Sequence, residues 1–69
     1  MQGFGKRLIE LRTERKVMQK TVAELLGVSP RQMQNYEKDK QEPSLTQLVQ
    51  IARFYSVSVD YLLGLSDRE

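Results

Sequence analysis

Few side chains in this sequence could carry out bond-making chemistry. It has no Cys and no His, so it lacks a thiolate nucleophile, an imidazole base and the usual transition-metal ligands. Asp, Glu, Lys, Ser and Tyr are present, but no pair of them falls in a motif that joins a base to an oriented nucleophile. We therefore expect no enzyme, no metal or other cofactor and no small-molecule ligand.

The segment around Met33 is rich in side chains that donate or accept hydrogen bonds. If this segment is helical, Met33 and Tyr36 point inward and their polar neighbours form the outer face. A polar helix face is more often solvated than functional, so its meaning depends on the elements that hold it. The polar neighbours are Arg31, Gln32, Gln34 and Asn35.

Apolar spacing and capping residues predict five helices. Gly27 and Gly64 are expected to end the second and the fifth of them, because Gly readily takes the left-handed conformation. Candidate N-caps are Ser29, Ser44 and Ser58, and the first two have the capping-box spacing to Gln32 and Gln47. The expected bounds are about 4–15, 19–26, 30–37, 44–55 and 59–63, and the buried stripe of the fourth helix is expected to be Leu45, Leu48, Ile51, Ala52 and Tyr55.

The predicted fold class is all-α, a compact five-helix bundle formed by a single domain of residues 1–69. The local alternative is a strand over 55–61, where Val57 and Val59 alternate with serines. No apolar run is long enough for a transmembrane span or a signal-peptide core, so we expect a cytoplasmic protein with no membrane partner. A chain this small, without a disulfide or a metal ion, gains stability from self-association.

Charge is unevenly distributed along the chain, although the formal net charge is only +2. Residues 1–20 hold six Lys and Arg against two Asp and Glu, whereas residues 41–69 hold two against four. One end could therefore face a polyanion while the other faces solvent or a second subunit. Taken alone, the pattern favours ordinary solvated helix surfaces.

The expected helices 19–26 and 30–37 meet through only three residues, Gly27-Val28-Ser29. A turn that short forces a sharp crossing, for which Ala23 offers a small contact surface. The shared apolar core then holds the second helix with its polar face away from the body. At about 1.5 Å per residue that helix is about 12 Å long, comparable with the roughly 12 Å width of the DNA major groove.

Over nearly its whole length the chain resembles the phage repressor and Cro-like helix-turn-helix domains, the XRE family. Two positions depart from the family pattern: Met18 replaces the usual Ser or Thr N-cap, and Asp39 replaces a common Gly after the second helix of the pair. The motifs that carry the resemblance are Phe4-Gly5, Leu8-x-x-Leu11-Arg12, Gln19-x-x-Val22-Ala23-x-x-Leu26-Gly27-Val28-Ser29, Tyr36-Glu37, Pro43-Ser44 and Val57-Ser58-x-Asp60-Tyr61-Leu62-Leu63-Gly64.

The resemblance implies a sequence-specific regulator, with repression as the expected output, that binds double-stranded DNA. Arg can donate two hydrogen bonds to guanine, Gln and Asn can pair with adenine, and a Pro ring can contact a thymine methyl group. The implied base-contacting residues are Pro30, Arg31, Gln34 and Asn35, flanked by Gln19 and Lys38. The implied phosphate-contacting residues are Lys40, Gln41, Ser29, Arg15 and Lys20, together with backbone amides near Gln19.

Two further sets of residues are expected to be structural. In proteins of this resemblance an Arg of the first helix pairs with the Glu that closes the second helix of the pair, which predicts an ion pair between Arg12 and Glu37. Tyr36 and Tyr55 fall on apolar stripes and are expected in the core, not as stacking platforms for bases.

We expect a homodimer on an operator of two half-sites, because one short helix reads only a few base pairs. Its contact is expected on the last helix, at Val59, Tyr61, Leu62 and Leu65. The alternative for Leu62 and Leu65 is that they close the monomer core. The alternative function is a protein-interaction adapter, or an antitoxin-like partner-binding module, on the same fold; the acidic C-terminal third favours it slightly.

Overall fold

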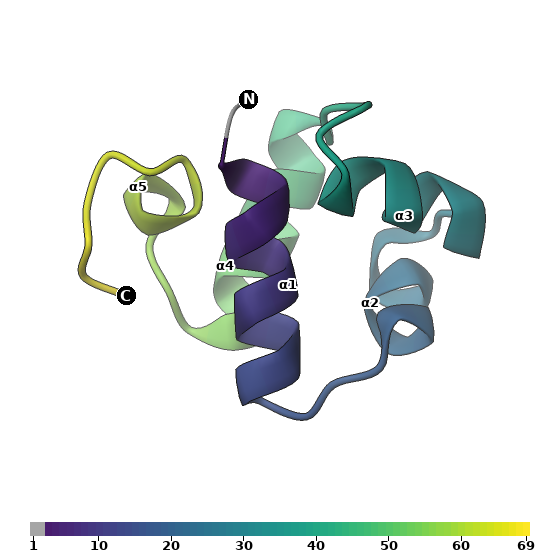
Figure 1. The fold of residues 1–69 in the computed structure, drawn as a ribbon, viewed down its shortest axis with the longest axis horizontal. Coiled ribbons are helices and arrows are strands. Elements are labelled where there is room, and N and C mark those ends of the chain that lie inside the picture. Colours follow the sequence, from purple (N-terminus) through teal and green to yellow (C-terminus); the bar gives the residue numbers. More distant parts are fainter. Residues whose placement is uncertain (1–2) are drawn as a thin grey trace.

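The computed structural model describes residues 3–69, and these form helices without any strand (Figure 1). The expectation of an all-α, five-helix bundle is confirmed. The expected helices over 4–15, 44–55 and 59–63 are each one residue shorter, because Arg15 and Leu63 are C-caps and Ser44 is an N-cap. The five helices are α1 (Phe4–Glu14), α2 (Gln19–Leu26), α3 (Pro30–Glu37), α4 (Leu45–Tyr55) and α5 (Val59–Leu62).

The strand alternative over 55–61 is wrong. Ser56 takes the left-handed conformation, with φ of 56°, and ends α4. Ser58 is extended and caps α5, because its side chain accepts a hydrogen bond of 3.0 Å from the Tyr61 backbone. The alternation of valines with serines therefore reflects two helix caps that lie close together.

One apolar core joins all five helices. Leu45 is a corrected expectation, since it is the first residue of α4 and its surface is 76% exposed. Tyr36 and Tyr55 are buried, as expected for core residues. The buried apolar residues are Phe4, Leu8, Leu11, Val22, Ala23, Leu26, Met33, Tyr36, Leu48, Ile51, Ala52, Tyr55, Val57 and Leu62.

The helices are arranged so that α2 and α3 lie on one side of α1 and α5 lies on the other (Figure 1). α1 packs against both α3 and α5, and α4 packs against α2 and α5. No helix within residues 3–69 is long and apolar enough to cross a membrane.

Candidate nucleic-acid interface

The turn between α2 and α3 is fixed by local geometry. Gly27 takes the left-handed conformation with φ of 69°, and Val28 N–H donates to the Ala23 carbonyl at 3.0 Å. Ser29 then caps α3 by accepting a 3.1 Å hydrogen bond from the Gln32 backbone. The expected reciprocal half of this capping box does not form, since the Gln32 side chain donates to the Tyr36 hydroxyl instead.

α3 buries one side and leaves the other in solvent. Met33 and Tyr36 enter the core, where their burial stabilises the fold. The outer side carries the side chains expected to read bases: Pro30, Arg31, Gln34 and Lys38 are exposed and Asn35 is half-buried.

The C-terminal end of α3 is tied to α1 and α2 by a buried carboxylate. Glu37 Oε2 accepts a hydrogen bond of 2.8 Å from Arg12 Nε, and Glu37 Oε1 accepts one of 3.0 Å from Gln19 Nε2. The Glu37 side chain is only 5% exposed, so its charge depends on these donors. Arg12 also donates to the Val17 carbonyl at 3.3 Å.

This arrangement changes the expected role of Gln19. Its amide nitrogen is committed to Glu37, so the side chain helps to hold α3 at the start of α2. The sequence resemblance indicates the pair of Arg12 and Glu37 but not this third member.

A second polar network, which the sequence analysis missed, holds the middle of α3 against α4. The Tyr36 hydroxyl accepts from Gln32 Nε2 at 2.9 Å and donates to Gln47 Oε1 at 3.0 Å. Gln47 also completes the capping box with Ser44 and donates to the Leu26 carbonyl at 3.4 Å. The only sequence signal for it is the capping-box spacing of Gln47, which indicates a local role.

The turn after α3 is a Schellman motif. Lys40 N–H donates to the Asn35 carbonyl at 2.9 Å and Asp39 N–H donates to the Tyr36 carbonyl at 3.2 Å. Gln41 N–H also donates to the Asn35 carbonyl, at 3.3 Å. These amides are used within the chain, whereas the side chains of Lys40 and Gln41, which are expected to contact phosphate, are exposed.

The other expected phosphate-contacting residues separate into two groups. Lys20 and Ser29 are exposed at the two helices of the turn motif. Arg15 lies elsewhere, since its guanidinium donates to the Tyr55 carbonyl at 2.9 Å and to Glu69 at 3.0 Å. These contacts hold Arg15 at the end of α4, and the structure does not bring it to α3.

The expected dimer residues also differ among themselves. Leu62 is 0% exposed and belongs to the monomer core, so its expected place on a dimer surface is wrong. Val59 and Tyr61 are half-buried, and the Tyr61 ring lies 4.2 Å from the guanidinium carbon of Arg7. Leu65 is 74% exposed and does not close the core.

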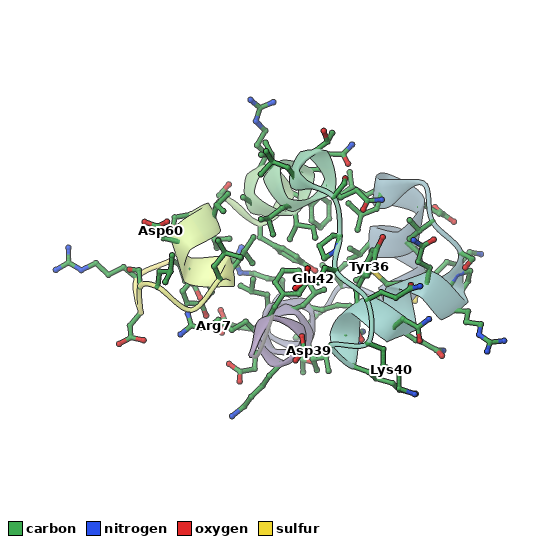
Figure 2. The ribbon with its side chains drawn as sticks, turned by 90° about the horizontal axis from the view of Figure 1, so that it is seen from above. Arg7, Tyr36, Asp39, Lys40, Glu42 and Asp60 are labelled. Atoms are coloured by element: carbon green, nitrogen blue, oxygen red, sulfur yellow. The ribbon has the colours of Figure 1, made fainter. Side chains whose placement is uncertain are left out.

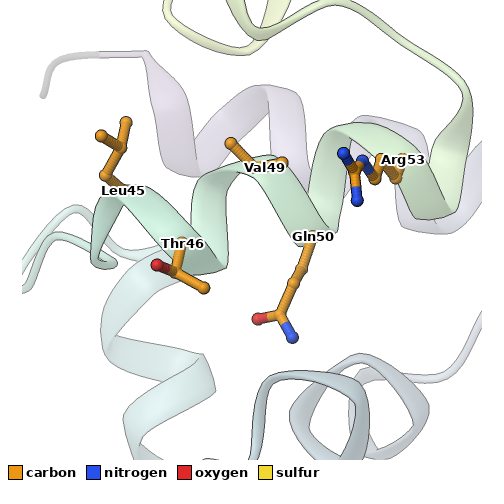
Figure 3. Close-up of a pocket in the computed structure, with 5 residues that line it drawn as sticks. All are labelled: Leu45, Thr46, Val49, Gln50 and Arg53. Carbon is orange, nitrogen blue, oxygen red and sulfur yellow. The ribbon is translucent and has the colours of Figure 1, made fainter.

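A pocket lies along the outer face of α4 (Figure 3). All its lining residues come from α4 alone, so no polar groups from other helices converge on it. Among the described residues no cluster of three His, Cys, Asp or Glu could hold a metal ion. The lining residues are Leu45, Thr46, Val49, Gln50 and Arg53.

Known proteins with similar sequences are regulators from bacteria. The chain is 42% identical over 64 residues to the uncharacterized HTH-type transcriptional regulator YobD of Bacillus subtilis, covering 93% of this chain and 57% of YobD. It is 42% identical over 62 residues to ImmR, an HTH-type transcriptional regulator of the same organism, covering 90% of this chain and 49% of ImmR. It is 34% identical over 64 residues to the cryptic phage CTXphi transcriptional repressor RstR of Vibrio cholerae, covering 93% of this chain and 58% of RstR. The chain thus spans about half the length of these relatives.

Solved structures agree with the fold. A transcriptional regulator from Listeria innocua superposes with a TM-score of 0.85 at 30% identity, over 88% of this chain and 57% of the other. The P22 c2 repressor, solved in complex with a synthetic operator, superposes with a TM-score of 0.79 at 27% identity, over 90% and 94%. The helix-turn-helix family model matches residues 8–62. The chain therefore belongs to the helix-turn-helix family, in the branch that contains phage-type repressors.

Proposed function

We propose that this chain binds double-stranded DNA sequence-specifically, as the recognition module of a transcriptional repressor, with α3 in the major groove. The observation that carries the proposal is the exposed polar side of α3, whose opposite side is locked by the core and by Glu37. A helix fixed in this way can present hydrogen-bonding groups to base edges without first being ordered. The family membership and the printed names of RstR and the P22 c2 repressor support it.

Each polar or apolar side chain on the outer side of α3 and its C-cap has a distinct role in this proposal. Arg31 donates two hydrogen bonds to guanine O6 and N7, while Gln34 and Asn35 pair with adenine N6 and N7. Pro30 contacts a thymine methyl group, and Lys38 lies at the flank of the site. Lys20, Ser29, Lys40 and Gln41 contact phosphates, and this sets the register of the protein without adding sequence information.

The test compares two arginine substitutions that each remove one positive charge. A duplex is first selected from a randomised pool with the wild-type protein, and R31A and R53A are then titrated against it and against a scrambled duplex. Arg53 is exposed on α4, away from α3, so R53A controls for the loss of one positive charge. R31A should weaken binding to the selected duplex by about 1 to 3 kcal/mol and leave binding to the scrambled duplex nearly unchanged.

Equal effects of the two substitutions on the selected duplex would contradict base reading by α3. Binding that does not weaken as salt rises would contradict DNA binding as such, because neutralised phosphates release counterions. The second result would favour the protein-interaction adapter.

We also propose that the protein acts as a homodimer on two half-sites, with Val59 and Leu65 in the contact. Leu65 is mostly exposed, although an apolar residue gains from burial, and Tyr61 is partly shielded by Arg7. Sedimentation equilibrium should detect a dimer whose dissociation constant rises with L65S. A monomer at all concentrations, or a dimer unaffected by L65S, would contradict this contact.

A further inference from the structure

Asp39 is the residue that connects the turn after α3 to the start of α1. It takes the left-handed conformation with φ of 58°, at the position of the Schellman motif where Gly is usual. A non-Gly residue is strained there, although Asp tolerates the conformation better than most. Its side chain Oδ1 accepts a hydrogen bond of 2.9 Å from the backbone N–H of Gly5.

This hydrogen bond supplies a cap that the N-cap residue of α1 cannot. Gly3 is that N-cap and offers no side chain, so it makes no side-chain hydrogen bond to the first amides of the helix. Asp39 takes the place of a capping side chain from 34 residues away, and its negative charge faces the positive end of the helix dipole. Figure 2 shows Asp39 over the N-terminal end of α1, with Lys40 directed away from it.

The contact is supported by close packing of the two backbones. A Cβ added to Gly5 would lie 2.9 Å from the Tyr36 carbonyl oxygen and nearer still to the Glu37 carbonyl. The start of α1 and the end of α3 are therefore in direct contact, and Asp39 ties the turn after α3 to α1.

Two effects of Asp39 on DNA binding oppose each other. Asp39 stands between Lys38 and Lys40 in the sequence and all three are exposed, so its negative charge should repel a phosphate backbone. Its tie to Gly5 holds the turn in one geometry, which reduces the cost of ordering Lys40 against a phosphate.

We propose that Asp39 is a positioning residue for DNA binding, which places Lys40 against the phosphate backbone through its contact with Gly5. The inference rests on the proposed function. It assigns a role to a residue at which the chain departs from its family pattern.

The test uses D39N and D39G, two variants with the same net charge. Asn tolerates the left-handed conformation and keeps an oxygen that can accept from Gly5, whereas Gly keeps the conformation and loses the acceptor. At about 0.1 M salt, D39G should bind the selected duplex about three- to tenfold more weakly than D39N. In D39G the slope of log affinity against log salt concentration should be smaller in magnitude by about one than in D39N, because one phosphate contact is lost.

K40A in both backgrounds tests whether Asp39 acts through Lys40. It should weaken binding several-fold in D39N and by less than about twofold in D39G, because positioning has already been lost there. Thermal melts establish that each variant folds. Hydrogen exchange of the Gly5 amide establishes which variant keeps the cap. The inference would be overturned if D39G bound the duplex as tightly as D39N. It would also be overturned if K40A weakened binding equally in both backgrounds. If the wild-type protein binds no duplex at all, the proposed function itself fails.

Discussion

At the scale of single residues, Gly5 sets how closely α1 approaches α3. It lies within a helix, where Gly is about 1 kcal/mol less favourable than Ala. Its missing side chain leaves room for the Tyr36 and Glu37 carbonyls, which a Cβ would overlap. The approach places the Gly5 amide beside Asp39.

G5A should therefore destabilise the protein by about 1 to 3 kcal/mol, although helix propensity alone predicts a gain. The measurement is the midpoint of urea unfolding at unchanged slope. K6A, at the exposed neighbouring position of the same helix, is the control and should be nearly neutral. A G5A protein as stable as wild type would show that the backbone contact is not tight.

Tyr55 carries a hydroxyl that is buried with no hydrogen-bond partner among the described residues. Burial raises the pKa of Tyr55; Arg12 and Arg15 act to lower it, and Glu37 acts to raise it. A buried hydroxyl without a partner costs stability, because it loses its hydrogen bonds to water on folding.

Y55F should therefore stabilise the protein by about 1 kcal/mol at neutral pH. Above about pH 10 the unfolded tyrosine ionises while the folded one resists ionisation, so the wild type loses stability as pH rises. The advantage of Y55F should be constant below about pH 9 and grow above pH 10. Unfolding curves at several pH values test this, and a less stable Y55F at pH 7 would mean that the hydroxyl is well satisfied.

Among the helices, α2 begins without a side-chain cap, which lowers the stability of its first turn. Met18 is its N-cap, makes no side-chain cap hydrogen bond and is 66% exposed. By contrast, Ser29, Ser44 and Ser58 each accept a hydrogen bond from the backbone three residues on.

M18S should stabilise the protein by about 1 kcal/mol and raise its melting temperature by about 4 to 8 °C. S44A should lower stability by a similar amount, because it removes an existing cap. Thermal unfolding of the two variants measures both effects. No gain from M18S, with the expected loss from S44A, would show that this end of α2 is already satisfied.

The helices could be predicted from the sequence because their caps and apolar spacing are local signals. Gly27, Ser44 and Ser58 each mark a boundary within a few residues of the helix they limit. The prediction that Leu45 is buried is wrong, because a first-turn residue can share the helical spacing of the core stripe and still face solvent.

The site could be predicted only in part, because several of its side chains have distant partners. The exposed face of α3 follows from periodicity and the turn, and the pair of Arg12 and Glu37 follows from the resemblance. The contacts of Gln19 with Glu37, Gly5 with Asp39 and Arg15 with Glu69 span 18, 34 and 54 residues. No local pattern specifies such pairs.

At the scale of the whole molecule, the contacts of the arginines alter what the uneven charge of the chain means. Half of the six cations in residues 1–20 are paired, since Arg7, Arg12 and Arg15 contact Asp67, Glu37 and Glu69. The basic N-terminal end is thus partly neutralised within the molecule. The proposed DNA binding therefore relies on the exposed cations at the turn motif, which are Lys20, Arg31, Lys38 and Lys40.

Methylation interference on the selected duplex tests most directly whether α3 enters the major groove. Dimethyl sulfate modifies guanine at N7 in the major groove and adenine at N3 in the minor groove. If α3 enters the major groove, guanine methylation within each half-site prevents binding, adenine methylation does not, and R31A loses the sensitivity at one guanine per half-site. Interference confined to adenine N3, or interference at neither base, would show that α3 does not lie in the major groove.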